Sequence, residues 1–113
     1  IANYAVGFNN IDIHYARSKG IVVTNTPDVL TDATAEIAAS LIISCARRIP
    51  EAEQFMRENK FKGWEPDLYH GIQLTGKTLG IVGAGRIGQA TAKRLSGLTT
   101  QYLADAGSGS ISF

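Results

Sequence analysis

The segment from Gly76 to Gly97, GKTLGIVGAGRIGQATAKRLSG, limits the possible folds of this 113-residue chain more than any other segment does. An apolar run from Lys77 to Val82 leads into the pattern G-x-G-x-x-G, and a helical pattern from Arg86 to Leu95 follows it. Strand, glycine turn and helix in this order are typical of the opening unit of a dinucleotide-binding domain. The segment therefore predicts an α/β fold.

Each glycine of the pattern has a separate physical role in such a turn. Gly83 allows the chain to leave the strand sharply, Gly85 lets a pyrophosphate approach the backbone, and Gly88 allows the helix to pack against the strand. The free N–H groups and the dipole of the helix N-terminus would then hold the anion. The alternative interpretation is a tight turn without a ligand.

An acidic residue about 20 positions after the turn would complete the pattern by binding the ribose hydroxyls. Asp105 is the candidate, because it follows TTQYLA, a plausible second strand. A carboxylate at this place would favour NAD over NADP. Asp105 could equally be a surface residue of a tail, since residues 107–113 are rich in Gly and Ser and are typical of a linker.

The first 26 residues predict a strand, a helix and a second strand. Ile1 to Phe8 is mostly apolar, Ile11 to Lys19 has a helical pattern that Gly20 ends, and Ile21 to Thr24 is β-branched. These three pieces indicate one parallel, right-handed βαβ unit. Pro27 then interrupts the pattern.

The next predicted helix starts with Thr31 or Asp32 as its N-cap and continues to about Arg48. Its apolar residues fall on most faces, which predicts a helix that is buried nearly all round. The single cysteine, Cys45, lies in this apolar pattern, so we expect a buried side chain and not a nucleophile.

Pro50 ends that helix and can open another, in which Phe55 and Met56 are the predicted anchors. Residues 60–75 have no regular period, but they contain three large aromatic residues, which must cover other groups. These residues are Phe61, Trp64 and Tyr69. They either pack on their own domain or reach across a dimer.

The overall composition excludes several classes of partner. Eleven basic and ten acidic residues are interspersed and give a net charge of +1, so we expect no nucleic acid or membrane surface as a partner. One cysteine allows neither an internal disulfide nor a cysteine zinc cluster, and it fits a cytoplasmic location. Because the chain opens in mid-pattern and Met56 is its one methionine, we interpret it as a fragment.

Two long motifs together resemble the D-isomer-specific 2-hydroxyacid dehydrogenases, especially the glyoxylate/hydroxypyruvate reductase branch. The motifs are TNTPDVLTDATAEIAASLIISCARR and LTGKTLGIVGAGRIGQATAKRL. The resemblance implies a two-domain protein with a flavodoxin-like substrate domain and a Rossmann cofactor domain. Residues 1–26 would end the first segment of the substrate domain. Residues 27–113 would hold the hinge helix, a dimerisation arm and the opening βα unit, with a divergent tail at 98–113.

The same resemblance implies particular ligand contacts. Val6 and Gly7 match a loop whose backbone binds the substrate carboxylate, and Thr34 matches a position near the nicotinamide. The run from Ala84 to Ile87 matches the pyrophosphate contacts, so Ala84, Gly85, Arg86 and Ile87 join Gly83 and Gly88 as cofactor-binding residues. The implied cofactor is NAD or NADP, the implied substrate is a small 2-oxo acid, and the implied assembly is a homodimer or a higher self-association.

In that family an Arg, a Glu and a His carry the catalysis, and no segment of this sequence matches them. His14 and His70 lie elsewhere and are expected to be solvated or structural. We therefore expect the chain alone to be inactive. The alternatives are a non-catalytic truncated Rossmann module that acts in oligomerisation or nucleotide binding, and another NAD-binding family of similar architecture, such as the formate-type dehydrogenases.

Overall fold

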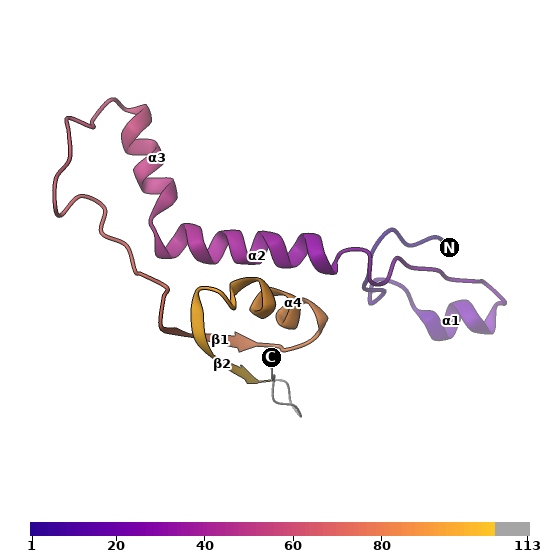
Figure 1. Ribbon diagram of the computed structural model, residues 1–113. Coiled ribbons are helices and arrows are strands. Elements are labelled where there is room, and N and C mark those ends of the chain that lie inside the picture. Colours follow the sequence, from indigo (N-terminus) through magenta and orange to yellow (C-terminus); the bar gives the residue numbers. More distant parts are fainter. Residues whose placement is uncertain (106–113) are drawn as a thin grey trace.

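The computed structural model describes residues 1–105, and for Thr99–Asp105 it describes the backbone alone. Within this range the chain contains four helices and two strands, arranged in an elongated molecule of 68 × 37 × 17 Å (Figure 1). The radius of gyration is 20.3 Å, whereas a compact chain of this length has about 13 Å. The residues predicted to form a tail, 107–113, lie outside the described range.

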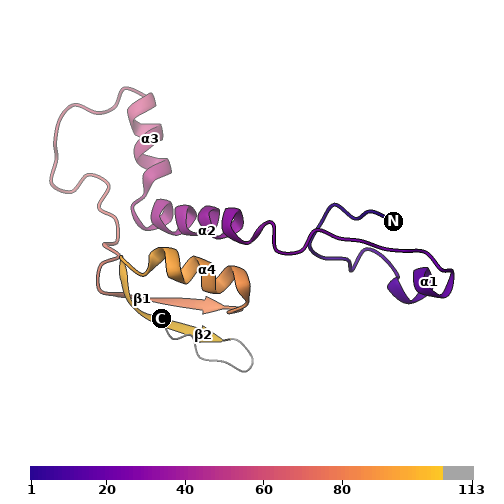
Figure 2. The same cartoon turned by 45° about the vertical axis from the view of Figure 1, so that its right-hand side comes forward.

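The centre of the molecule consists of three layers. Strands β1 (Lys77–Val82) and β2 (Thr99–Asp105) form a parallel pair, helix α4 (Arg86–Leu95) covers the pair, and helix α2 (Thr31–Ala46) lies on the other side of α4 (Figures 1 and 2). The predicted bounds of β1 and α4 are confirmed, and so is a strand over TTQYLA. Parallel pairing across one helix is the geometry of a βαβ unit.

Among the described elements, helix α4 contributes more buried residues than any other, because it is enclosed from two sides. Thr91, Ala92 and Leu95 are at most 6% exposed, and Leu95 is the largest fully buried side chain. The Thr91 hydroxyl donates a hydrogen bond to the carbonyl oxygen of Ile87, at 2.9 Å, which satisfies the one buried polar side chain among the described residues.

Helix α2 is buried on one stripe, so the prediction of burial nearly all round was wrong. Ala35 and Ala39 face α4, while Ile37 and Leu41 are 63% and 58% exposed, and Cys45 is exposed rather than buried. The stripe is narrow because one neighbouring helix, α4, packs against α2 along its length. The predicted caps were also wrong: Leu30 is the N-cap, with no side-chain cap bond, and Thr31 and Asp32 lie inside the first turn.

Two alanines at positions i and i+4 allow α2 and α4 to approach closely. Replacing Ala35, which is 0% exposed, with Leu should therefore lower the free energy of unfolding by about 1–3 kcal/mol, because the larger side chain overpacks this contact. Urea denaturation followed by circular dichroism measures the change. The matched control is Ala33→Leu on the exposed face of α2, and equal effects of the two substitutions would contradict this packing.

An ion-pair cluster also joins these two helices. The guanidinium of Arg94 on α4 donates hydrogen bonds to Asp32, at 2.9 Å, and to Glu36, at 3.4 Å, on α2. The hydrogen bond to Asp32 is the largest cause that raises the pKa of Arg94 above its ordinary value; desolvation opposes it, and the hydrogen bond to Glu36 adds to it. The cluster joins the last turn of α4 to the first two turns of α2.

Helix α3 (Ile49–Arg57) has Arg48 as its N-cap, whose φ of 55° turns the chain away from α2, and Pro50 stands in its first turn as predicted. Phe55 contacts Tyr69 edge to face, with ring centroids 5.3 Å apart, so this anchor is confirmed. Met56 is 56% exposed, and the prediction that it is an anchor was wrong. Within the described chain, few other residues pack on α3.

The connection after α3 is irregular, as predicted, and returns to the C-terminal end of α2. The Ile72 N–H donates to the Ala46 carbonyl oxygen at 2.6 Å, and a Cβ on Gly71 would lie 2.5 Å from that oxygen. Tyr69 packs on its own chain, whereas Trp64 is 84% exposed. For Tyr69 the structure therefore agrees with the first alternative, packing on its own domain. A contact of Trp64 across a dimer stays a prediction.

The first 26 residues form a helix flanked by extended segments rather than two full strands. Helix α1 (Ile13–Ser18) is capped by Asp12, and Gly20, at φ 68°, ends it. A single parallel bridge, Ala2 to Thr24, replaces the predicted strands Ile1 to Phe8 and Ile21 to Thr24. The parallel direction was predicted correctly, but no third strand flanks these segments in the described structure, and two unsupported strands are marginal.

Candidate dinucleotide and substrate site

The glycine turn lies between the end of β1 and the first turn of α4. Gly83 has a φ of 91°, a left-handed conformation that a residue with a side chain adopts at a cost, and Gly85 is the N-cap of α4. The first N–H groups of a helix have no acceptor within the helix, so those of α4 face the cleft beside this turn. This arrangement is suited to an anion.

Gly85 and Gly88 differ in the space around them. A Cβ on Gly88 would lie 2.5 Å from the Gly83 carbonyl oxygen and 3.2 Å from a methyl carbon of Ile81. A Cβ on Gly85 would meet no heavy atom within 4 Å. Gly88 therefore lets the helix contact the strand and the turn, and Gly85 keeps an open approach to the backbone. The turn thus has the free space that a pyrophosphate requires.

A cleft of 220 Å³ brings the glycine turn together with segments that are distant in the sequence. It is lined by residues of the turn and by residues of the chain before and at the start of α2: Val6, Asp28, Leu30, Thr31, Gly83, Gly85, Arg86, Ile87 and Gly88. The cleft therefore joins Val6 of the predicted carboxylate loop to five of the six predicted pyrophosphate residues. Sequence spacing alone did not place these two groups beside each other.

The loop at Val6 and Gly7 is held by two asparagine side chains. The Asn25 amide donates to the Val6 carbonyl oxygen at 2.8 Å, and the Asn3 amide donates to the Gly7 carbonyl oxygen at 2.7 Å. The N–H groups of Val6 and Gly7 donate to no other group in the part of the chain that the structure describes. With both carbonyls held in this way, the two N–H groups remain available to an anion.

The remaining predicted site residues lie around this cleft. Ala84 is buried, and its carbonyl oxygen accepts a hydrogen bond from the Gln89 amide at 2.9 Å. Thr34 is exposed in the first turns of α2 and does not line the cleft, although Thr31, one turn earlier, does. The backbone of Asp105 pairs with Val82, so β1 and β2 end at the same edge of the sheet, beside the glycine turn.

Asp28 was not predicted as a site residue, although it belongs to the motif TNTPDVL. Its carboxylate forms an ion pair with Arg86, the residue directly after Gly85 in the turn. Asp28 also has a φ of 68°, which is unusual for a residue other than glycine. The Asn-Thr-Pro-Asp sequence, with two turn-forming side chains around a proline, was the signal that could have indicated a defined turn here.

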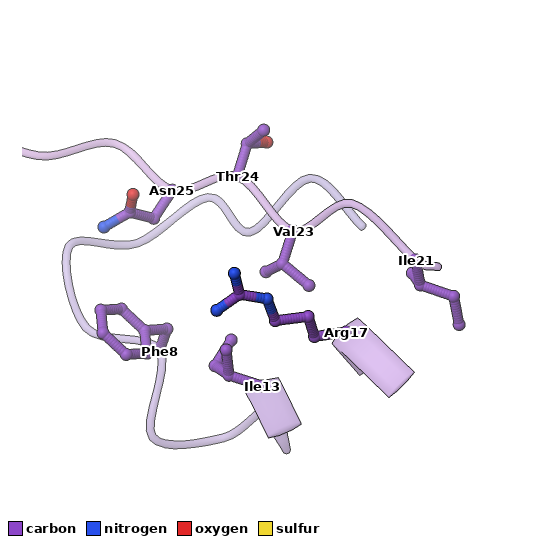
Figure 3. Close-up of a pocket in the computed structure, with 7 residues that line it drawn as sticks. All are labelled: Phe8, Ile13, Arg17, Ile21, Val23, Thr24 and Asn25. Atoms are coloured by element: carbon purple, nitrogen blue, oxygen red, sulfur yellow. The ribbon is translucent and has the colours of Figure 1, made fainter. Parts of the chain in front are cut away.

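A second cavity, of 320 Å³, lies within residues 1–26 and away from the glycine turn. Figure 3 shows Arg17 between Ile13 and Val23, with its guanidinium extending into the cavity toward Phe8 and Asn25. No residue of this cavity was predicted as a site residue. The two histidines, His14 and His70, are exposed and lie in neither cavity.

A carboxyl group with a lowered pKa lies away from the cleft. Hydrogen bonds from Lys60 and then Gln54 lower the pKa of Glu58 at the end of α3. Lys60 and Glu58 are partly exposed and form an ion pair on the surface. The polar groups of the cleft are backbone groups, the Arg86 guanidinium, the Asp28 carboxylate and the Thr31 hydroxyl.

The glycine turn between a parallel strand and a helix places the chain among α/β proteins with a dinucleotide-type phosphate turn. Residues 39–109 match the family model described as D-isomer specific 2-hydroxyacid dehydrogenase, NAD binding domain. The chain is 58% identical over 101 residues to a glyoxylate reductase of Thermococcus litoralis, an alignment that covers 86% of this chain. The chain belongs to the D-isomer specific 2-hydroxyacid dehydrogenase family.

Solved structures agree with this assignment. The TT0316 protein of Thermus thermophilus superposes with a TM-score of 0.84 at 47% identity, over 89% of this chain and 33% of that one. An NADPH-dependent glyoxylate/hydroxypyruvate reductase of Sinorhizobium meliloti, solved with NADP and malonate, gives a TM-score of 0.73 at 35% identity, over 93% and 37%. The chain spans about a third of the length of these proteins, and 30% of the Thermococcus reductase.

No helix of the described residues combines the length and the apolar character that crossing a membrane requires.

Proposed function

We propose that this chain is part of an NAD(P)-dependent oxidoreductase that reduces a small 2-oxo acid, glyoxylate or hydroxypyruvate, to the 2-hydroxy acid. The supporting observation is the shared cleft, in which the loop at Val6 and the glycine turn line one space of 220 Å³. A reductase of this kind must hold a carboxylate close to a dinucleotide. The names of the similar reductases support this choice of substrate.

In this proposal the glycine turn holds the cofactor pyrophosphate. The fit is supported by the left-handed Gly83, the open space at Gly85 and the N-terminus of α4. The cofactor-binding residues are Gly83, Ala84, Gly85, Arg86, Ile87 and Gly88, with Asp105 toward the ribose and Thr34 toward the nicotinamide. When bound, the reduced nicotinamide would supply the hydride.

The substrate carboxylate would bind to the N–H groups of Val6 and Gly7. Asn3 and Asn25 support this role, because they hold the two carbonyls and so set the direction of the N–H groups. Charge-assisted hydrogen bonds from backbone N–H groups to a carboxylate are among the stronger polar contacts. The same two groups do not by themselves distinguish glyoxylate from hydroxypyruvate, since both acids carry the carboxylate.

The proposed organisation is that of a two-domain enzyme. Residues 1–26 would end the first segment of a flavodoxin-like substrate domain, and residues 27–113 would open a Rossmann domain, with 98–113 as a divergent tail. The elongated shape supports this division, because residues 1–26 extend away from the layers of α2, α4 and the sheet (Figures 1 and 2). The similar solved proteins are about three times as long.

We also propose that the chain associates with a second copy. Ile37 and Leu41 expose the apolar face of α2, and Trp64 in the long connection is 84% exposed. Exposed apolar groups of this size are typical of a surface that another protein covers. The alternative function is a non-catalytic module that acts only in oligomerisation or nucleotide binding, and its oligomerisation part rests on this face of α2.

The experiment is a titration of the purified chain with NADH, followed by fluorescence, with glyoxylate added at the end. We expect saturable binding in the micromolar range and no NADH oxidation above a sample without protein, since no segment matches the family's catalytic Arg, Glu and His. Turnover would contradict the predicted inactivity. Absence of binding to NADH and, in a second titration, to NADPH would overturn the cofactor site and favour the oligomerisation module. Sedimentation velocity of the same sample reports the association.

A further inference from the structure

The ion pair between Asp28 and Arg86 closes one side of the cleft at the glycine turn. Both residues line the cleft, and their charged groups contact each other across it. Their side chains are 65% and 64% exposed, so the pair lies at the mouth of the cleft and not in the protein interior. The pair therefore lies beside the first turn of α4 and is accessible to solvent.

The carboxylate of Asp28 has the chemistry of the ligand expected at this place. A helix N-terminus with an adjacent guanidinium attracts a negatively charged oxygen group, whether that group comes from a phosphate or from a side chain. In the described structure, the cleft-lining residue that supplies such a group is Asp28. A pyrophosphate at the same turn would meet the negative charge of Asp28 and would require the guanidinium of Arg86.

The backbone conformation of Asp28 indicates that its contact with Arg86 is specific. Its φ of 68° lies in the left-handed region, which Asp and Asn tolerate better than most other residues with a side chain. The Val29 N–H donates to the Pro27 carbonyl oxygen at 2.9 Å, which closes a tight turn around Asp28. This turn directs the carboxylate toward the guanidinium of Arg86.

We propose that Asp28 is a competing anion that sets the affinity of the glycine turn for dinucleotides: its carboxylate holds Arg86, and the cofactor pyrophosphate must displace it. The inference rests on the proposed cofactor site. Residues 27–30 connect the segment that carries Val6 and Gly7 to helix α2. Displacement of Asp28 therefore releases a contact between that connection and the glycine turn, so that cofactor binding loosens the link to the substrate loop.

The test compares NADH binding to the wild-type chain and to Asp28→Asn at low salt. Asn keeps the size of the side chain and tolerates the same φ, but it removes the charge. We expect the dissociation constant for NADH to fall by about two- to fivefold, the range of an exposed ion pair, and the gain to shrink at high salt. Asp28→Gly, which suits a positive φ, is the second variant if Asp28→Asn folds poorly.

Two further variants separate displacement from simple charge repulsion. Asp67→Asn removes an exposed carboxylate in the long connection, outside the cleft, and should leave NADH binding unchanged. Arg86→Gln should weaken NADH binding and should remove the gain from Asp28→Asn in the double variant. An equal gain with and without Arg86 would overturn the displacement.

The outcomes also distinguish this inference from the function on which it rests. If the wild-type chain binds NADH and Asp28→Asn binds it equally well, the role of Asp28 is overturned while the cofactor site stands. If neither chain binds NADH or NADPH, the cofactor site is overturned and the role of Asp28 with it. Binding of NADH by Asp28→Asn and not by the wild-type chain would support both the cofactor site and the role of Asp28. The Asp28 carboxylate would then prevent cofactor binding completely.

Discussion

Gly88→Ala will lower the free energy of unfolding of this chain by about 1–3 kcal/mol, the usual cost of forcing an extra methyl group into a close contact. The new Cβ would lie 2.5 Å from the carbonyl oxygen of Gly83 and 3.2 Å from a methyl carbon of Ile81. The nearer neighbour is backbone and cannot rotate away. Helix α4 must therefore move away from the end of β1, and since α4 holds the largest buried side chain, the whole central layer is affected.

Urea denaturation followed by circular dichroism at 222 nm measures this effect. The matched control is Gly97→Ala, at the other end of the same helix, where an added Cβ meets no atom within 4 Å. We expect a clear fall in the denaturation midpoint for Gly88→Ala and little change for Gly97→Ala. Equal midpoints for the two variants would contradict the close contact between α4 and the turn.

Gly85→Ala, in the same turn, will weaken NADH binding while changing the free energy of unfolding little. An added Cβ at Gly85 meets no protein atom within 4 Å, and this N-cap position has a negative φ, so we expect a stability change below about 1 kcal/mol. The methyl group would nevertheless occupy the approach to the backbone N–H groups. The dissociation constant for NADH should therefore rise by about tenfold or more, as a close clash of this size would require.

NADH titration and urea denaturation of the same Gly85→Ala preparation check both parts of this prediction. Gly80→Ala in β1, where an added Cβ also meets no atom within 4 Å, is the control for the loss of a glycine outside the cleft. Unchanged NADH affinity in Gly85→Ala would show that the ligand does not approach the turn from this side. A large loss of stability would show that the space around Gly85 is smaller than described.

The strand, the glycine turn and the helix from Lys77 to Leu95 were predicted with the bounds that the structure has. Their signals are local: an apolar run of strand length, glycines where the chain must turn, and basic residues in the last helical turn. Each of these signals depends on residues within about ten positions of one another. The prediction of Pro50 at the start of α3 was local in the same way. The backbone chemistry of such segments determines their form with little help from distant parts of the chain.

Helix α2 shows why the remaining predictions failed. Its length was predicted nearly correctly, but Ile37, Leu41 and Cys45 were expected inside and are exposed. The apolar residues of this helix fit several faces equally well. Its periodicity therefore could not select the stripe of Ala35 and Ala39, which depends on the helix packed against it. The same reason explains the single bridge where two strands were expected, because a strand requires neighbours that its own sequence does not specify.

The amino-acid sequence by itself determined the βα unit, the glycine turn and the family, because those depend on local stereochemistry and on residue order. The tertiary structure decided which distant groups share the cleft. It placed Val6 beside Gly85, held the carboxylate loop with Asn3 and Asn25, and paired Asp28 with Arg86. The hydrogen bonds of Asn3 and Asn25 form within residues 1–26. Val6 and Gly85, like Asp28 and Arg86, lie tens of residues apart in the sequence, so their proximity depends on how α2 packs on α4. No local pattern contains that information.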